Sequence, residues 1–211
     1  MIRIEKFAPP ANYEREVRRP GLNFLRRNPN PSAIDFSRHS YWKAIHNELY
    51  QLYSGICSYC SSWTARNPRP NRDNTSVDHF IPKSIHPNLA YEWTNFRLCR
   101  ARLNAKKDNS TEVMDPCYIK NGWFQIDFRT FLMNTSSDTP NIIREYVNRS
   151  IDILGLNDDD YVNERLEIIR LYALEEITID ELGAKYPFIA EEIRRSNFDI
   201  DLKPIMHAYF R

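Results

Sequence analysis

The sequence has no apolar run of the about 18 residues that a membrane-crossing helix needs. Its first residues, MIRIEKFAPPANYEREVRR, also lack the apolar segment and the small-residue cleavage site of a secretory signal peptide. Internal repeats and low-complexity tracts are missing as well. We therefore expect a cytoplasmic protein with no membrane partner.

Cysteine is scarce, with four residues at positions 57, 60, 99 and 117. Disulfides are rare in the cytosol, so we expect these thiols to be reduced. Cys57 and Cys60 have the C-x-x-C spacing of a zinc knuckle or of a redox motif. No strand–helix–strand pattern surrounds the pair, which weakens the redox interpretation.

The net charge of +1 conceals an uneven distribution of charge. Residues 1–110 contain 18 Lys and Arg against 9 Asp and Glu, a balance of +9, whereas residues 111–211 contain 11 against 19, a balance of −8. A basic half indicates contact with a polyanion such as nucleic acid. The alternative is two solvated faces that attract each other.

Composition and periodicity divide the chain into three segments. Residues 1–37 are rich in proline, arginine and asparagine and predict an irregular N-terminal arm after a short strand at IRIE. Residues 38–135 open with a helix, predicted over residues 38–54, whose apolar side chains recur at helical spacing. Residues 136–211 predict a mainly helical region. The fold class that follows is α+β.

Short elements are predicted within these segments. SVDHF and NFRLC have the character of strands, RARLNAKKD that of a short basic helix, and GWFQIDF that of a further strand. Five later stretches predict helices, and in one of them Thr178 is the N-cap with Glu181 near the capping-box position. The five stretches are PNIIREYVNRSIDIL, DDDYVNERLEIIRLYALEEI, TIDELGAKYP, PFIAEEIRRS and KPIMHAYF.

The stretch SVDHFIPKS, residues 76–84, contains an Asp-His pair at the end of a short apolar run. Such a pair alone is more often part of a surface turn than of an active site. Here Asn95 follows at the start of the second predicted strand, and Asn104 lies in the basic helix. Hydrolysis of a phosphodiester needs a base for water and positive charge, often a divalent metal ion, near the phosphate. His79 has the pKa range of such a base, and Asp78 and Asn104 could supply oxygen ligands to Mg²⁺.

Basic side chains close to this pair would hold the scissile phosphate. One geometric condition applies, because consecutive residues of a regular strand point to opposite faces. Asp78 and His79 can serve one site only if the strand twists or ends there, and the Ile81-Pro82 step favours an ending. The basic residues are Lys83, Arg100, Arg102, Lys106 and Lys107.

The motifs VDHFIPKS, YEWTNFRLC and LNAKK resemble the HNH endonucleases, whose core is the ββα-metal fold. The resemblance implies that His79 is the general base and that Asn95 braces the loop that positions it. It also implies that Asp78 and Asn104 bind a divalent metal ion, Mg²⁺ with Mn²⁺ or Ni²⁺ as alternatives. The implied substrate is DNA, and because little in the sequence suggests base readout, we expect weak sequence specificity.

A looser resemblance extends from MIRIEK to the VMDP and GWFQIDF segments. It links most of the chain to the HNH nucleases of retron and Septu-type antiphage systems, the PtuB-like group. This likeness implies a role in defence against phage or plasmid DNA and a partner ATPase of the PtuA-like kind.

One departure from the HNH pattern concerns zinc. Many HNH proteins bind a structural Zn²⁺ through two C-x-x-C pairs, but Arg102 stands where the partner of Cys99 is expected. A zinc site would need Cys117 to fold back and join Cys57, Cys60 and Cys99; otherwise Cys99 and Cys117 are small buried hydrophobic residues. The alternative to a nuclease is a zinc-knuckle DNA-binding or assembly module with a degenerate nuclease core.

Two other histidines have predicted places. His46 lies next to apolar positions of the helix over residues 38–54 and is predicted to be a packing residue. His86 is predicted to lie on the surface of the loop that follows the Asp-His pair.

Overall fold

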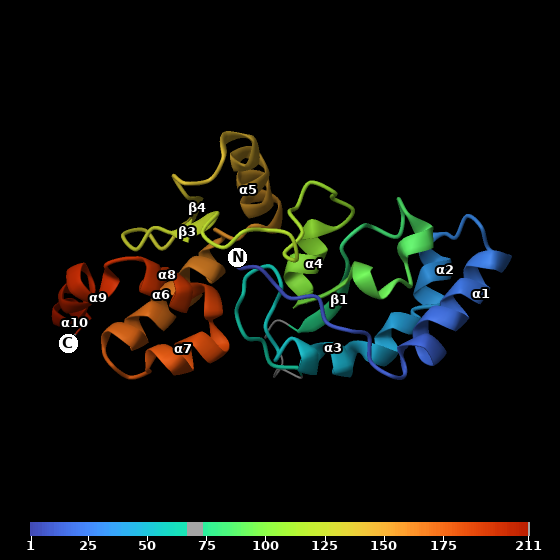
Figure 1. Cartoon of the computed structure of the whole chain (residues 1–211), viewed down its shortest axis with the longest axis horizontal. Helices are drawn as coiled ribbons and strands as arrows, with labels where there is room; N and C mark the ends of the chain where they lie inside the picture. The colour runs from blue at the N-terminus through green and yellow to red at the C-terminus, as the bar shows by residue number, and fades with distance from the viewer. Residues whose placement is uncertain (67–73, 211) are drawn as a thin grey trace. The chain divides into compact units, whose positions relative to one another are not determined.

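The computed structural model describes residues 1–66 and 74–210, which form a mixed α+β fold with two small antiparallel sheets (Figure 1). The chain divides into two compact units, which differ from the three segments that the sequence suggested. The β1–β2 unit comprises Glu5–Ser58 and Thr64–Thr111. The helical unit comprises Met1–Ile4, Tyr59–Trp63 and Glu112–Arg211.

The β1–β2 unit contains the predicted order of strand, loop, strand and helix. Strand β1 (Thr75–His79) pairs antiparallel with β2 (Phe96–Arg100), with His79 opposite Phe96. Helix α4 (Ala101–Lys107) begins directly after β2 and packs against both strands. The sequence predictions for SVDHF, NFRLC and RARLNAKKD are therefore confirmed. Two single helical turns, η3 (Pro87–Leu89) and η4 (Trp93–Asn95), lie in the loop between the strands.

The helix predicted over residues 38–54 is present in two parts. A 3₁₀ segment, η2 (Tyr41–Ile45), continues into α3 (His46–Leu52), and both contact the rest of the unit through buried apolar side chains such as Ile45 and Leu49. The chain leaves α3 through Gly55, whose φ of 72° is a left-handed conformation that glycine adopts at little cost.

The prediction of an irregular N-terminal arm over residues 1–37 is wrong, because much of this segment is helical. Val17, Gly21 and Phe24 are buried at helical spacing, and this apolar stripe fixes a helix despite the polar composition around it. The prolines do not prevent it, since one lies in the first turn of α1, where no amide donor is needed. The strand predicted at IRIE is also wrong, because these residues have no strand structure. The helices are η1 (Glu14–Arg18), α1 (Arg19–Arg27) and α2 (Ala33–Arg38).

Gly21 allows α1 to approach the loop between β1 and β2. A Cβ atom at this position would lie 2.1 Å from the ring of Tyr91, so any side chain would collide with it. Tyr91 is fully buried, and its hydroxyl donates to the carbonyl oxygen of His39. The N-terminal helices therefore pack against the loop that follows β1.

The helical unit matches the predictions more closely. GWFQIDF supplies β3 (Phe124–Ile126), which pairs with β4 (Met133–Thr135), a strand that was not predicted. The five predicted helices are confirmed, and the Thr178–Glu181 capping box is present at the start of α7. A further short helix, α9, was not predicted. The helices are α5 (Asn141–Leu154), α6 (Asp159–Ala173), α7 (Ile179–Lys185), α8 (Pro187–Arg195), α9 (Phe198–Asp201) and α10 (Lys203–Phe210).

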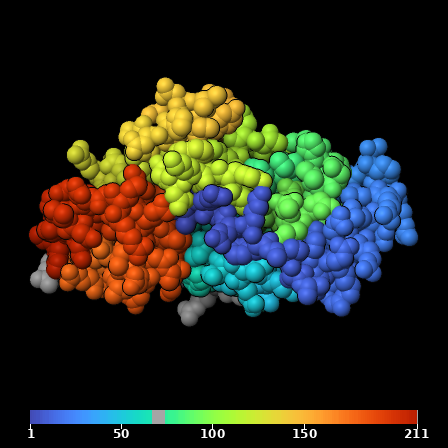
Figure 2. All heavy atoms as spheres, in the orientation of Figure 1, coloured from blue at the N-terminus to red at the C-terminus, as the bar shows by residue number. Residues whose placement is uncertain are grey.

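Helix α5 lies at the surface of its unit, where it is the gold region of Figure 2. Its residues Ile142 and Tyr146 are exposed, while Val147, Ile151 and Leu154 are buried on the other side of the helix. Within residues 1–66 and 74–210, no helix is both long and apolar enough to cross a membrane.

Candidate functional site

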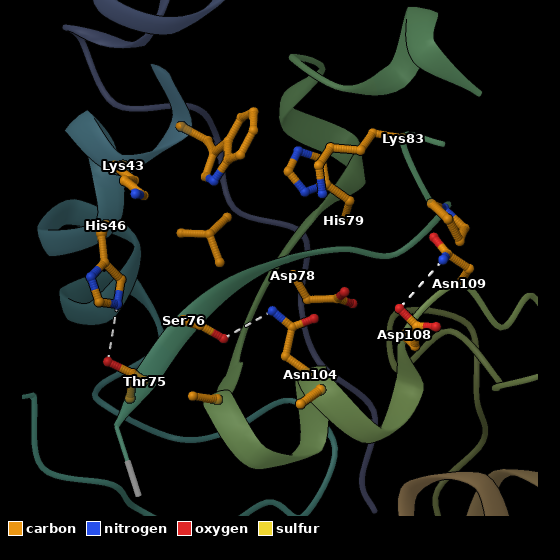
Figure 3. Close-up of a pocket in the computed structure, with 15 residues that line it drawn as sticks. Lys43, His46, Thr75, Ser76, Asp78, His79, Lys83, Asn104, Asp108 and Asn109 are labelled. Carbon is orange, nitrogen blue, oxygen red and sulfur yellow. Dashed lines mark hydrogen bonds between the residues drawn. The ribbon is translucent and has the colours of Figure 1, made fainter. Parts of the chain in front are cut away.

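The β1–β2 unit contains a pocket of about 630 Å³ (Figure 3). Its walls come from residues 42–46 of the η2–α3 helix, residues 75–83 of β1 and the loop after it, and residues 101–109 of α4 and its C-terminal end. Asp78, His79 and Asn104 line this pocket together. The structure therefore brings together the three residues that the sequence proposed as base and metal ligands.

Asp78 and His79 are the last two residues of β1, opposite Arg97 and Phe96 of β2. The strand ends at His79, as the proline that follows it predicted. After His79 the amide nitrogen of Phe80 still donates to the carbonyl oxygen of Asn95 over 2.9 Å. Because β1 ends at His79, the side chains of Asp78 and His79 both reach the same pocket, as a shared site requires.

His79 is only 6% exposed, and its imidazole is held by aromatic rings and one hydrogen bond. The rings of Trp42 and Phe96 meet it edge-on at centroid distances of 4.5 and 5.3 Å. Its Nε2 lies 2.8 Å from the carbonyl oxygen of Ala90. A carbonyl oxygen can only accept, so Nε2 carries the proton and the lone pair of the neutral ring is on Nδ1.

Burial lowers the pKa of His79 from its ordinary 6.5 to about 3, and the positive charges of Lys83 and Lys107 act in the same direction. The hydrogen bond to Ala90 opposes this shift only in part. The ring is therefore neutral at physiological pH, which is the protonation state that a general base needs.

Asn95 connects three points of the loop that leaves β1. Its Oδ1 accepts from the amide of Ile81 over 2.7 Å, and its Nδ2 donates to the carbonyl oxygens of Ile81 and Leu89 over 2.9 and 3.1 Å. Leu89 directly precedes Ala90, the partner of His79. Asn95 is 4% exposed and thereby fixes the backbone on both sides of the His79 ring.

Asp78 is a buried carboxylate with a buried cation beside it. The Lys107 Nζ lies 3.3 Å from Asp78 Oδ1 and donates to the carbonyl oxygen of His79 over 3.1 Å. Burying an unpaired carboxylate costs free energy, and the Lys107 ammonium offsets this cost for Asp78. The pair also ties the end of α4 to the end of β1.

Asn104 presents its amide oxygen to the same region. Its Nδ2 donates to Ser76 Oγ over 3.1 Å, which fixes the orientation of the amide, and Figure 3 shows the group beside the Asp78 carboxylate. Carboxylate and amide oxygens are the ligand types that Mg²⁺ prefers. Asp78 and Asn104 therefore fit a divalent cation that takes two protein oxygens and completes its shell with water and substrate.

Of the basic residues proposed for phosphate binding, Lys83 lines the pocket. Its Nζ lies 5.5 Å from the centre of the Trp42 ring, a cation–π distance. Burial lowers the pKa of this half-buried ammonium from its ordinary value, whereas the carboxylate of Asp78 acts in the opposite direction. Arg102 and Lys106 are exposed on α4, one turn apart, and do not line the pocket.

Arg100 and Lys107 do not have the exposed positions that phosphate binding requires, which corrects their proposed role. Arg100 is 9% exposed, and its Nε donates to Thr64 Oγ1 over 2.8 Å. Lys107 is 1% exposed and is paired with Asp78. Both cations stabilise the interior of the unit.

All four cysteines are buried, and their thiols form no disulfide in the described part of the chain. The amide of Arg100 donates to Cys57 Sγ over 3.3 Å. Cys57 and Cys99 belong to the β1–β2 unit, and Cys60 and Cys117 to the helical unit. Among residues 1–66 and 74–210, no three or more His, Cys, Asp or Glu side chains are grouped so that they could hold a metal ion. A structural Zn²⁺ on these cysteines stays a prediction.

The sequence missed the wall of the pocket that the η2–α3 helix supplies. Trp42, Lys43 and His46 all line it, although His46 was predicted to be a packing residue. His46 is half-buried, and its Nε2 lies 3.0 Å from Thr75 Oγ1. The spacing of these residues within a single helical turn was the available signal. His86 is exposed and does not line the pocket, as predicted.

The comparisons with known proteins supply no family for this chain. Neither a protein-family model nor a curated protein sequence matches it significantly. The function of the pocket is therefore inferred from its own residues.

Proposed function

We propose that this protein is a metal-dependent endonuclease that hydrolyses DNA phosphodiester bonds with little sequence specificity, with an HNH-type core formed by β1, β2 and α4. The observation that carries the proposal is the hydrogen bond from His79 Nε2 to Ala90 in a pocket that Asp78 and Asn104 also line. It supports a neutral imidazole with its lone pair on Nδ1, beside two oxygen ligands suited to a divalent cation.

His79 would take the proton from the attacking water. With the ring fixed by Trp42, Phe96 and Ala90, the imidazole needs little reorganisation to accept this proton. A bound phosphate brings negative charge into the pocket and thereby raises the pKa of His79 toward the range of an effective base. The low pKa of His79 in the protein without bound phosphate is thus compatible with its role as the base.

Lys83 would bind the non-bridging oxygens of the scissile phosphate. Its ammonium is held beside Trp42 and lies near enough to His79 to lower the pKa of the imidazole. Asp78 and Asn104 would hold the divalent cation, which supplies positive charge for the phosphate and the leaving oxygen when it is bound. Lys107 would hold the Asp78 carboxylate in place.

DNA as the substrate is supported by the charge of the chain. Residues 1–110, which include the whole pocket, contain 18 Lys and Arg against 9 Asp and Glu. Such an excess favours binding to a polyanion through its backbone, with little discrimination between sequences.

Cleavage of supercoiled plasmid tests the proposal. We expect the purified protein to nick the plasmid with Mg²⁺ or Mn²⁺ and not with EDTA. His79→Ala and His79→Gln should each lower the rate by at least about 100-fold, the usual contribution of a general base. His86→Ala is the matched control, because this exposed histidine lies outside the pocket.

Two results would contradict the nuclease. One is cleavage at the wild-type rate by a folded His79→Gln variant. The other is a wild-type protein that shifts DNA in a gel with EDTA and with Mg²⁺ alike and never nicks it, which would favour the DNA-binding or assembly module.

We further propose that the nuclease works in antiphage defence with a partner ATPase. This proposal is supported by the sequence resemblance to retron and Septu-type nucleases alone. A neighbouring ATPase gene whose product co-purifies with this chain and is needed for protection against phage would support it. Rapid degradation of DNA by the purified chain alone would show that no gating partner is required.

A further inference from the structure

The η2–α3 helix runs beside β1 and contacts both of its ends. Trp42 packs against His79 at the last residue of the strand, with ring centroids 4.5 Å apart. His46 reaches Thr75 at the first residue, with Nε2 3.0 Å from Oγ1. Both ends of β1 line the same pocket, so the pocket follows the strand along its whole length (Figure 3).

The length of this pocket exceeds what one phosphate needs. Thr75 and His79 are four residues apart, which is about 13 Å along an extended strand. Successive phosphates of one DNA strand are separated by about 3.4 Å of rise along the helix axis. A phosphate bound at His79 and Lys83 therefore leaves room in the pocket, near Thr75 and His46, for another phosphate of the same strand.

The side chains at the Thr75 end have the charge that such a phosphate would need. Lys43 is exposed and lines the pocket, and His46 lies one 3₁₀ turn after it on the same face. Burial lowers the pKa of His46, and the positive charge of Arg66 lowers it further, so Arg66 is a second cation near this end of the pocket, beside Lys43. The negative charge of a bound phosphate would act against the charge of Arg66 and raise the pKa of His46.

Among residues 1–66 and 74–210, the carboxylates that line the pocket lie away from its Thr75 end. Asp78 and Asp108 are its acidic lining residues, and Asp78 is paired with Lys107. Asp108 raises the pKa of Lys83, which places its charge close to that residue, and Figure 3 shows it on the side away from His46. In the part of the chain that the structure describes, the Thr75 end thus presents an exposed lysine, Lys43, and no lining carboxylate.

We propose that Lys43 and His46 form a second phosphate-binding subsite, which holds another backbone phosphate of the strand whose scissile phosphate lies at His79 and Lys83. The inference rests on the proposed function, since it gives the η2–α3 wall a role in positioning the same DNA strand. It assigns Lys43 to direct contact with the phosphate and His46 to contact through its ring N–H or its charge.

Binding of a fluorescent DNA duplex to the wild-type chain in EDTA tests this subsite without turnover. The dissociation constant is measured by anisotropy between about 50 and about 200 mM salt, where each lost phosphate contact reduces the slope of log affinity against log salt by about 0.9. We expect Lys43→Ala to bind more weakly and to lose about 0.9 of slope, and Lys43→Arg to keep the wild-type slope. His46→Gln, which can still bond to Thr75, should weaken binding in the same direction.

Lys6→Ala is the charge-matched control, because Lys6 is an exposed lysine of the same unit outside the pocket. The subsite is overturned if Lys43→Ala and Lys6→Ala have the same affinity and slope, or if the wild-type chain binds no DNA. Plasmid cleavage separates the two proposals. If the wild-type chain cleaves plasmid and Lys43→Ala does not change the salt slope, only the subsite proposal is contradicted. If Lys43→Ala lowers the slope and the wild-type chain cleaves no DNA, the subsite is supported and the nuclease proposal is contradicted.

Discussion

The Nζ atom of Lys107 lies 3.3 Å from Asp78 Oδ1, and the two side chains are 0% and 3% exposed. The same ammonium donates to the carbonyl oxygen of His79, so one cation at the end of α4 fixes both residues of the Asp-His pair. Breaking a buried ion pair by removing one partner leaves an uncompensated buried charge, which is far more costly than losing a surface pair.

Lys107→Met should therefore destabilise the protein by about 3–5 kcal/mol, since it leaves the buried Asp78 carboxylate without its cation. Urea unfolding followed by circular dichroism measures this loss. Lys106→Met is the matched control, because Lys106 is the exposed neighbour on the same helix and its substitution should change stability by less than about 0.5 kcal/mol. Equal effects of the two substitutions would contradict the role given to the buried pair.

Asn95→Ala should lower both stability and activity. It removes three hydrogen bonds and leaves the polar backbone atoms of Ile81 and Leu89 without this partner. We expect a loss of at least about 2 kcal/mol in unfolding free energy, because each unsatisfied buried group costs about 1–3 kcal/mol. Cleavage should slow, because the loop that Asn95 braces contains both Ala90, the hydrogen-bond partner of His79, and Lys83, the proposed phosphate-binding residue. The exposed Asn30→Ala serves as control, and a similar small effect of both substitutions would count against the bracing of the loop.

Metal binding provides a test that does not depend on cleavage. Isothermal titration of the apo-protein with Mn²⁺ should detect a site that Asp78→Asn or Asn104→Ala weakens at least tenfold. Ser76→Ala should weaken it by about 10-fold, because the hydroxyl orients the Asn104 amide and loss of such an orienting partner usually costs 10–100-fold in affinity. Asn104→Asp retains an oxygen ligand and adds negative charge, so it should bind Mn²⁺ more tightly than Asn104→Ala. Unchanged affinity in both Asp78→Asn and Asn104→Ala would place the cation elsewhere.

The buried His79 should make the metal-free protein less stable in acid. Its pKa is about 3 in the folded protein and 6.5 in an exposed chain, so between these values the unfolded state binds the proton. Stability is fully present above pH 6.5 and is lost as the pH falls toward 3, by about 2 kcal/mol between pH 7 and pH 5. Urea unfolding in EDTA at both pH values should show this loss in the wild type and a smaller one in His79→Gln. The same pH dependence in both proteins would show that the loss of stability in acid does not come from the protonation of His79 on unfolding.

Most of the local structure could be predicted from the sequence. The strands around Asp78 and Asn95, helix α4 and the Thr178–Glu181 capping box follow from apolar periodicity and from hydrogen bonds between near neighbours, and both signals are local. The prolines and polar residues of the first 37 positions concealed the stripe of Val17, Gly21 and Phe24, so the helices there were missed. A weak periodic signal was outweighed by composition.

The sequence by itself determined the chemistry available to this protein: an imidazole at the end of a strand, a carboxylate and two amides at fixed spacing, and an excess of positive charge in the first half of the chain. Only the tertiary structure decided which cations face the pocket. Lys107 and Arg100 turn inward to Asp78 and Thr64, whereas Lys43 and His46 come from a helix about 30 residues before β1 and line the pocket. The physical reason is that the burial of a charge depends on partners contributed by distant segments, which no local pattern in the sequence records.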